Sequence, residues 1–134
     1  MSKALTPVRY IEKALRALEG ARVLLDTGNT EGACSRAYYA MFDATHAALR
    51  ATGIVAPDAE IKTHNGLLTL FSKELVRTKR IDDKFNKVLN QVQQLRLVAD
   101  YTGEPPEVEK AQWAVEQAED FVAAIRNMIE RGSP

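Results

Sequence analysis

The chain has 134 residues, of which 46% are hydrophobic and 27% are charged, and its formal net charge at pH 7 is zero. This length predicts one domain over residues 1–134, and the composition is typical of a soluble globular protein rather than a disordered chain. The single cysteine, Cys34, excludes an internal disulfide and favours a reducing compartment. No apolar run resembles a signal peptide or a membrane span, so we expect a cytoplasmic protein with no membrane partner.

The first predicted helix follows Thr6 and Pro7, a capping hydroxyl and a proline that suits the first helical turn. Gly28 suits the left-handed position that closes a helix. The apolar residues expected on the inner side are Val8, Ile11, Leu15, Leu18 and Leu25.

A second helix is predicted over residues 30–53, and we expect it to lie at the centre of the fold. Six alanines recur along it at intervals of four and three, which is the period of one helical face: Ala33, Ala37, Ala40, Ala44, Ala47 and Ala51. This small-residue stripe lets another helix approach closely. Bulky stripes flank it, with Tyr39, Phe42, His46 and Leu49 on one side and Tyr38, Met41 and Thr45 on the other. Because this is more apolar surface than one small bundle covers, we also expect a homodimer.

The remainder of the chain predicts three further helices. An irregular connection over residues 54–61 precedes a shorter helix that starts at residues 63–66 and continues to Leu75, and a basic turn over 77–80 follows. The next helix is capped by Asp82 or Asp83 and stopped by residues 102–106, with expected core positions Phe85, Val88, Val92, Leu95 and Ala99. The last helix, closed by Gly132, has a heptad pattern at Val108, Ala111, Val115, Ala118, Val122, Ile125 and Ile129. The pattern predicts an all-α, up-and-down bundle of about five helices, four long and one shorter.

Charge is unevenly distributed along the chain. Residues 62–96 carry eight bases and three acids, whereas residues 97–134 carry three bases and eight acids. Such an uneven distribution of charge can steer a phosphate-bearing ligand or a charged partner, although two solvated helix faces give the same pattern. The candidate basic patch comprises Lys73, Arg77, Lys79, Arg80, Lys84 and Lys87.

Three motifs in this order resemble the small prokaryotic HEPN (higher eukaryotes and prokaryotes nucleotide-binding) domains. They are SRAYYAMF at residues 35–42, KTHNGL at 62–67 and LRLVADY at 95–101. The resemblance implies a helical bundle that is often a homodimer. It also implies frequent pairing with a minimal nucleotidyltransferase in toxin–antitoxin-like or nucleotide-linked systems.

Some branches of this family are metal-independent ribonucleases, in which an arginine is followed after four to six residues by a histidine. Here Arg96 matches the arginine, but Tyr101, Thr102 and Gly103 stand where the histidine is expected. A tyrosine, with a pKa near 10, is a poor general base in neutral solution. Tyr101 can still donate a hydrogen bond, stack on a base or accept a transferred nucleotidyl group.

Strict alternation of helix direction predicts one site at the pole where the second helix ends. It brings together His46, His64, Arg96, Asp100 and Tyr101, the nucleotide- or RNA-binding candidates, and leaves Ser35 and Tyr39 toward the other pole, about 17 Å away. Purely structural alternatives remain open for each. Arg96 and Asp100 also fit a local ion pair, His46 a buried core histidine, and His64 a helix cap.

Two functions follow from these observations. The first is a non-catalytic module that binds a nucleotide, RNA or a minimal nucleotidyltransferase through Arg96 and the basic segment. The second is a weak metal-independent ribonuclease in which Arg96 and His64 are catalytic. The spacing of the histidines and the cysteine predicts no metal site, and no motif predicts a cofactor.

Overall fold

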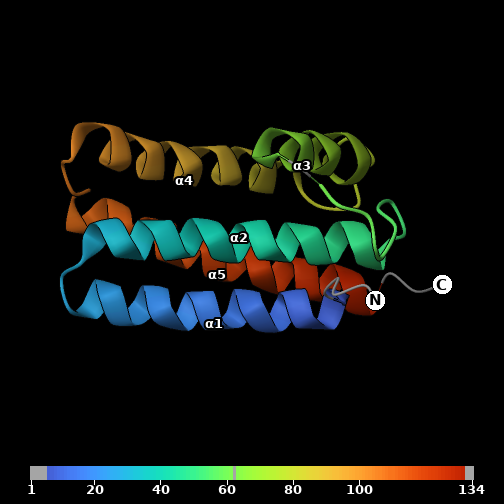
Figure 1. Cartoon of the computed structure of the whole chain (residues 1–134), viewed down its shortest axis with the longest axis horizontal. Helices are drawn as coiled ribbons and strands as arrows, with labels where there is room; N and C mark the ends of the chain where they lie inside the picture. The colour runs from blue at the N-terminus through green and yellow to red at the C-terminus, as the bar shows by residue number, and fades with distance from the viewer. Residues whose placement is uncertain (1–5, 62, 132–134) are drawn as a thin grey trace.

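The structure, a computed structural model, describes residues 6–61 and 63–131. Its helices are α1 (Pro7–Asp26), α2 (Thr30–Ala51), α3 (His64–Phe71), α4 (Asp83–Thr102) and α5 (Val108–Arg131), and α3 continues into a π-helical turn, η1 (Ser72–Val76). No strand occurs in these described ranges. The predicted all-α bundle, with four long helices and one short one, is confirmed (Figure 1).

Polar caps and glycines set the helix boundaries. The Thr6 hydroxyl accepts a hydrogen bond from the Arg9 amide, and Thr63 caps α3 in the same way. The Asp82 carboxylate accepts from the Lys84 amide at 2.9 Å, so Asp82 rather than Asp83 is the cap of α4. Gly103, with φ of 74°, ends α4 in the left-handed conformation that glycine adopts at low cost. The predicted closure of α5 by Gly132 lies outside the described residues.

The central position predicted for α2 is confirmed, because it contacts α1, α3, α4 and α5. The small-residue stripe is fully buried from Ala33 to Ala47, and only Ala51, in the last turn, is exposed. The stripe is therefore covered inside one chain. It does not supply the surplus apolar surface from which the homodimer was expected.

The predicted inner face of α1 is confirmed only in part. Its buried residues are Ala14, Ala17 and Ala21, whereas Val8 is 69% exposed and Leu15 is 38% exposed. The predicted Ile11, Leu18 and Leu25 are only partly buried. The physical reason is that α1 approaches the centre of the bundle through its alanines, so its larger side chains lie at the rim of the contact.

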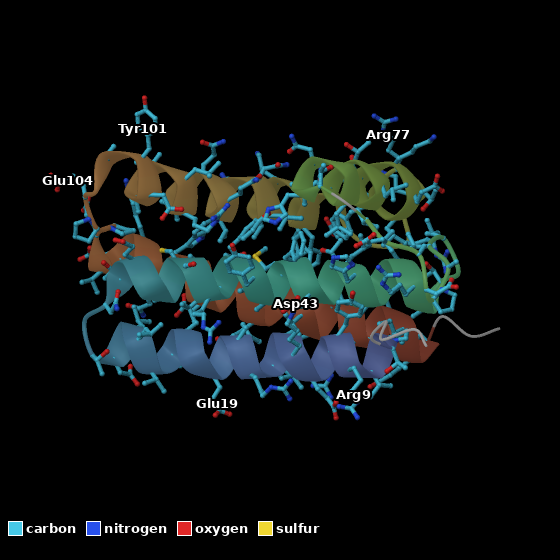
Figure 2. All side chains as sticks on the ribbon, in the orientation of Figure 1. Arg9, Glu19, Asp43, Arg77, Tyr101 and Glu104 are labelled. Atoms are coloured by element: carbon cyan, nitrogen blue, oxygen red, sulfur yellow. The ribbon has the colours of Figure 1, made fainter. Side chains whose placement is uncertain are left out.

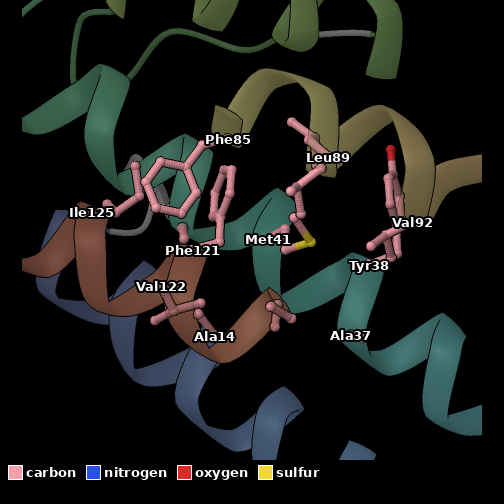
Figure 3. Packing of buried hydrophobic residues seen from close by; sticks show 14 of the residues in the cluster. Ala14, Ala37, Tyr38, Met41, Phe85, Leu89, Val92, Phe121, Val122 and Ile125 are labelled. Carbon is pink, nitrogen blue, oxygen red and sulfur yellow. The ribbon is translucent and has the colours of Figure 1, made fainter. Parts of the chain in front are cut away.

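The heptad of α5 is largely confirmed. Five of its predicted positions are buried, Ile129 is half-buried and Val108 is exposed. Sequence reasoning missed Phe121, which is fully buried and packs against Phe71 and Phe85 at ring distances of 5.5 and 5.8 Å. Figure 3 shows Phe85 and Phe121 beside Val122 and Ile125, where α4 and α5 meet.

The four long helices alternate in direction, but α3 does not add a reversal of its own. It belongs to the crossover from α2 to α4, so α4 ends beside the start of α2 (Figure 1). Arg50 Nη1 donates to the carbonyls of Ala56 and Ala59 at 3.0 and 2.9 Å, which ties the loop after α2 to the end of that helix. The prediction that α4 ends at the same pole as α2 is therefore wrong.

Candidate functional site

The candidate site lies where the first half of α2 faces the last turns of α4. Tyr38 and Phe42, four residues apart on α2, lie on neighbouring turns of one helical face. Figure 3 shows the Tyr38 side chain pointing from α2 toward α4, beside Val92. His64 is the first residue of α3, and Arg96 lies two turns before the end of α4. Three elements thus place their polar groups around one tyrosine ring.

Arg96 lies against aromatic rings. Its Cζ is 4.7 Å from the centre of the Tyr38 ring and 5.6 Å from that of Tyr39, both within cation–π range. Nη1 lies 3.4 Å from Oδ2 of Asp100, so the local ion pair exists, with a carboxylate that is 55% exposed. The Arg96 side chain is 14% exposed, and its buried Nε has no hydrogen-bond partner. The guanidinium is consequently fixed by rings more than by hydrogen bonds.

His64 completes this arrangement on the other side of Tyr38. Its Nδ1 lies 3.4 Å from the Tyr38 hydroxyl, and its ring centre lies 4.5 Å from that of Phe42. Burial raises the pKa of Tyr38, although the charge of Arg96 opposes the shift, so the phenol stays protonated near neutral pH. Tyr38 can therefore donate to Nδ1 when His64 carries its proton on Nε2.

Tyr101 does not join the cluster, contrary to the predicted grouping. It is 94% exposed and projects from the outer side of α4 (Figure 2). Five helical residues rotate a side chain by about 140° relative to Arg96, whereas the four to Asp100 rotate it by only about 40°. Tyr101 instead shares an open apolar surface with Leu97 and Val98, which are 40% and 55% exposed.

His46 belongs to a separate buried stack. Tyr10 of α1 lies parallel to its ring at 4.8 Å, and Arg50 Nη2 lies 3.4 Å from its Nδ1. Burial first, and then the charges of Arg50 and Lys13, lower the pKa of His46 to about 4, so it is neutral at pH 7. The structural alternative for His46 therefore holds. Phe42 touches both imidazoles. The predicted meeting of His46 with Arg96 is nevertheless wrong, because Arg96 packs against Tyr38, which precedes His46 by about 12 Å along α2.

The other residues of this stack escaped sequence reasoning. Asp43 is buried and lies 3.6 Å from Nζ of Lys13; burial raises the pKa of this carboxyl, and Lys13 opposes the shift. Tyr10 and Arg50 form a cation–π contact at 5.4 Å. Tyr10 and Lys13 come from a helix distant in sequence, so no local spacing points to them. A polar residue such as Asp43 within a run of apolar ones was the available signal.

The residues of the predicted basic patch are exposed, and four of them line two different cavities. Lys73 and Arg77 line a groove between α3–η1 and α4, whereas Lys79 and Arg80 line another cavity that Arg131 also reaches. Lys79 in addition forms an ion pair with Asp83 at 3.6 Å. Lys73 and Arg77 are therefore considered separately from Lys79 and Arg80.

Metal ligands, the single thiol and membrane-spanning helices are the remaining features of the chain that bear on function. In the part of the chain that the structure describes, no three histidine, cysteine or acidic side chains gather as metal ligands. Cys34 is buried, and burial raises the pKa of its thiol to about 11. No helix of the described residues has the length and apolar character to cross a membrane.

The fold is an all-α bundle. Its central helix carries two adjacent tyrosines that face an arginine near the end of the next long helix. The chain belongs to the HEPN domain family, because the family model described as HEPN domain matches residues 8–129. The resemblance stated from the three motifs is thereby confirmed.

Two relatives cover nearly the whole chain. A protein of Thermotoga maritima, named only as a UPF0332 protein, is 32% identical over 88% of this chain and 86% of its own length. A protein of Methanocaldococcus jannaschii that is named a putative toxin is 29% identical over 90% of this chain and 86% of its own. A second protein of that archaeon with the same kind of name is 32% identical over 69% of this chain and 60% of its own.

Proposed function

We propose that this chain is a non-catalytic nucleotide- or RNA-binding module of a toxin–antitoxin-like pair whose other member is a minimal nucleotidyltransferase. The toxin context is supported by relatives that are named putative toxins. The nucleotidyltransferase partner is supported by the family resemblance. The binding role is supported by the geometry around Arg96.

The observation that carries the binding role concerns the Arg96 guanidinium. Two tyrosine rings orient it, yet few of its hydrogen-bond donors have a partner. Its ion pair with the exposed Asp100 is 3.4 Å long, and its Nε has no partner. A phosphate that displaces Asp100 gains shorter, charge-assisted hydrogen bonds from a donor already held in place. Tyr39, half-buried beside it, offers a ring for a stacked base.

Titration of the protein with AMP and with fluorescein-labelled decauridylate tests this role. Arg96→Ala is expected to weaken binding of both ligands roughly ten- to a hundredfold, the value of one or two charge-assisted hydrogen bonds. Asp100→Asn is expected to strengthen it, because the competing carboxylate is removed. Arg16→Ala, which removes an exposed arginine of α1, is the matched control. Unchanged affinity in Arg96→Ala contradicts the proposal.

One observation favours the ribonuclease alternative: Arg96 and His64 both contact Tyr38, so the two are brought to one site despite the missing motif histidine. Incubation of the protein with total RNA and EDTA separates the two functions. The binding module is expected to leave the RNA intact. Cleavage by the wild type that is lost in both Arg96→Ala and His64→Ala would establish the enzyme instead.

We further propose a homodimer formed through the outer side of α4. The support is the exposed apolar group of Leu97, Val98 and Tyr101. Sedimentation at tens of micromolar is expected to give a dimer that Val98→Asp dissociates. Val23→Asp is the control, since Val23 on α1 is 57% exposed, close to the 55% of Val98. A monomeric wild type at this concentration rules the proposal out.

A further inference from the structure

A polar groove of about 420 Å³ lies between the α3–η1 segment and α4. Four side-chain amides, two hydroxyls, two cations and one leucine line it, and no carboxylate does. The amides are those of Asn65, Asn86, Asn90 and Gln93, and the cations are Lys73 and Arg77. Arg77 projects from the side of the molecule opposite α1 (Figure 2). The groove thus combines hydrogen-bond donors and acceptors with a positive charge.

The α4 wall of the groove has the repeat of an extended peptide. Asn86, Asn90 and Gln93 lie on one helical face, and Asn86 and Asn90 are separated by a rise of about 6 Å. The main-chain N–H and C=O groups on one edge of an extended chain recur every two residues, about 6.4–6.8 Å, which is roughly the same distance. Each amide has both a donor and an acceptor, as a peptide unit has. Asn90 Nδ2 already donates to the Asn86 carbonyl at 2.9 Å, which leaves its Oδ1 to accept from a ligand N–H.

The opposite wall supplies the charge. Lys73 and Arg77 are four residues apart on and after the π turn, which the Arg77 amide closes by donating to the Ser72 carbonyl at 2.9 Å. Turns of this kind are frequent at functional sites. Both cations are exposed, and neither forms an ion pair with a carboxylate of the described residues. They are therefore available to an acidic ligand.

The lining favours a peptide over a nucleic acid. Grooves that bind single strands combine a positive track with aromatic platforms for the bases. No aromatic side chain lines this groove, and two cations are few for a strand that carries a phosphate on every nucleotide.

We infer that this groove binds an extended acidic peptide segment of a partner protein. Its main chain pairs with the amides of α4, and carboxylates on alternate residues face Lys73 and Arg77. The inference goes beyond the proposed function and does not depend on Arg96.

Panning a phage-displayed library of random dodecapeptides on the immobilised full-length protein tests the inference. The enriched sequences are expected to carry Asp or Glu at alternate positions. A fluorescein-labelled synthetic copy of the strongest one is expected to bind the wild type and to lose at least tenfold in affinity in Lys73→Glu/Arg77→Glu and in Asn90→Leu. Lys87→Glu, a charge reversal on α4 outside the groove, is expected to change affinity less than twofold, with circular dichroism confirming the fold of each variant.

Three results would overturn the inference. They are the absence of acidic enrichment, peptide affinity that the groove variants leave unchanged, and loss of decauridylate rather than peptide binding in Lys73→Glu/Arg77→Glu. Arg96→Ala is expected to leave peptide binding intact. Failure of the peptide groove and failure of the Arg96 site are therefore distinguishable.

Discussion

His46 is a single residue that makes the stability of the fold depend on pH. Its pKa of about 4 in the folded chain lies below the ordinary value of 6.5, because it is buried and faces Arg50. Between these two pH values the unfolded chain therefore binds more protons than the folded one. The contribution of neutral His46 to the free energy of unfolding is therefore fully present above pH 6.5, and it is lost as pH falls toward 4. The candidate at the site, His64, lies in different surroundings beside Tyr38.

We predict that the free energy of unfolding in urea decreases by on the order of 3 kcal/mol between pH 6.5 and pH 4 because of His46. His46→Gln is expected to remove most of that slope, whatever it does to stability at pH 7. The measurement is the difference between the two proteins across the pH range, so the carboxylates common to both cancel. An identical slope in His46→Gln would contradict the buried, neutral histidine.

At the scale of elements, the sequence patterns located the helices well and their contacts less well. Caps such as Thr6 and Asp82 are local, so their sequence signals sufficed. The path from α2 to α4 is not local: the loop after α2 accepts hydrogen bonds from Arg50, which have no sequence signature. The mistaken direction of α4 placed Arg96 beside His46, whereas the structure places it against Tyr38. The sequence motifs could nominate Arg96 and His64 as candidates, but not the Tyr38 ring that both contact.

The alanine stripe of α2 gives an element-scale prediction with an internal control. Ala40 is fully buried, and a larger side chain there must separate packed helices. Ala40→Leu is expected to lower the free energy of unfolding by about 1–3 kcal/mol. Ala51→Leu, at the exposed end of the same stripe, is expected to change it by less than about 0.5 kcal/mol. Equal effects of the two substitutions in urea denaturation would show that the stripe is not a tight contact.

At the scale of the whole molecule, the first and last helices are joined by a bidentate ion pair. Arg22 Nε and Nη2 donate to the two carboxylate oxygens of Glu119 at 2.9 and 2.6 Å, and the hydrogen bond to Glu119 raises the pKa of Arg22. Both side chains are about 40% exposed, so solvent screens most of the attraction. Sequence spacing could not reveal this pair, because its members lie 97 residues apart.

A double-mutant cycle with Arg22→Met and Glu119→Gln is expected to give a coupling energy of about 0.5–1 kcal/mol, smaller at 1 M salt. The cycle uses the free energy of unfolding of the wild type, both single variants and the double variant. Gln112→Ala, which removes an exposed side chain of α5, is the control and should not couple to Arg22→Met. A coupling near zero at low salt would mean that α1 and α5 are held by apolar packing alone.

The most direct test of the binding role observes the Arg96 guanidinium itself. Its Nε–H resonance, assigned by its absence in Arg96→Lys, is followed by NMR during titration of the full chain with AMP. We predict a saturating shift of this resonance and of the Tyr39 ring signals, with the Arg22 resonance unchanged. If AMP leaves the Arg96 resonance in place up to millimolar concentration, the guanidinium is a structural group and not an anion site.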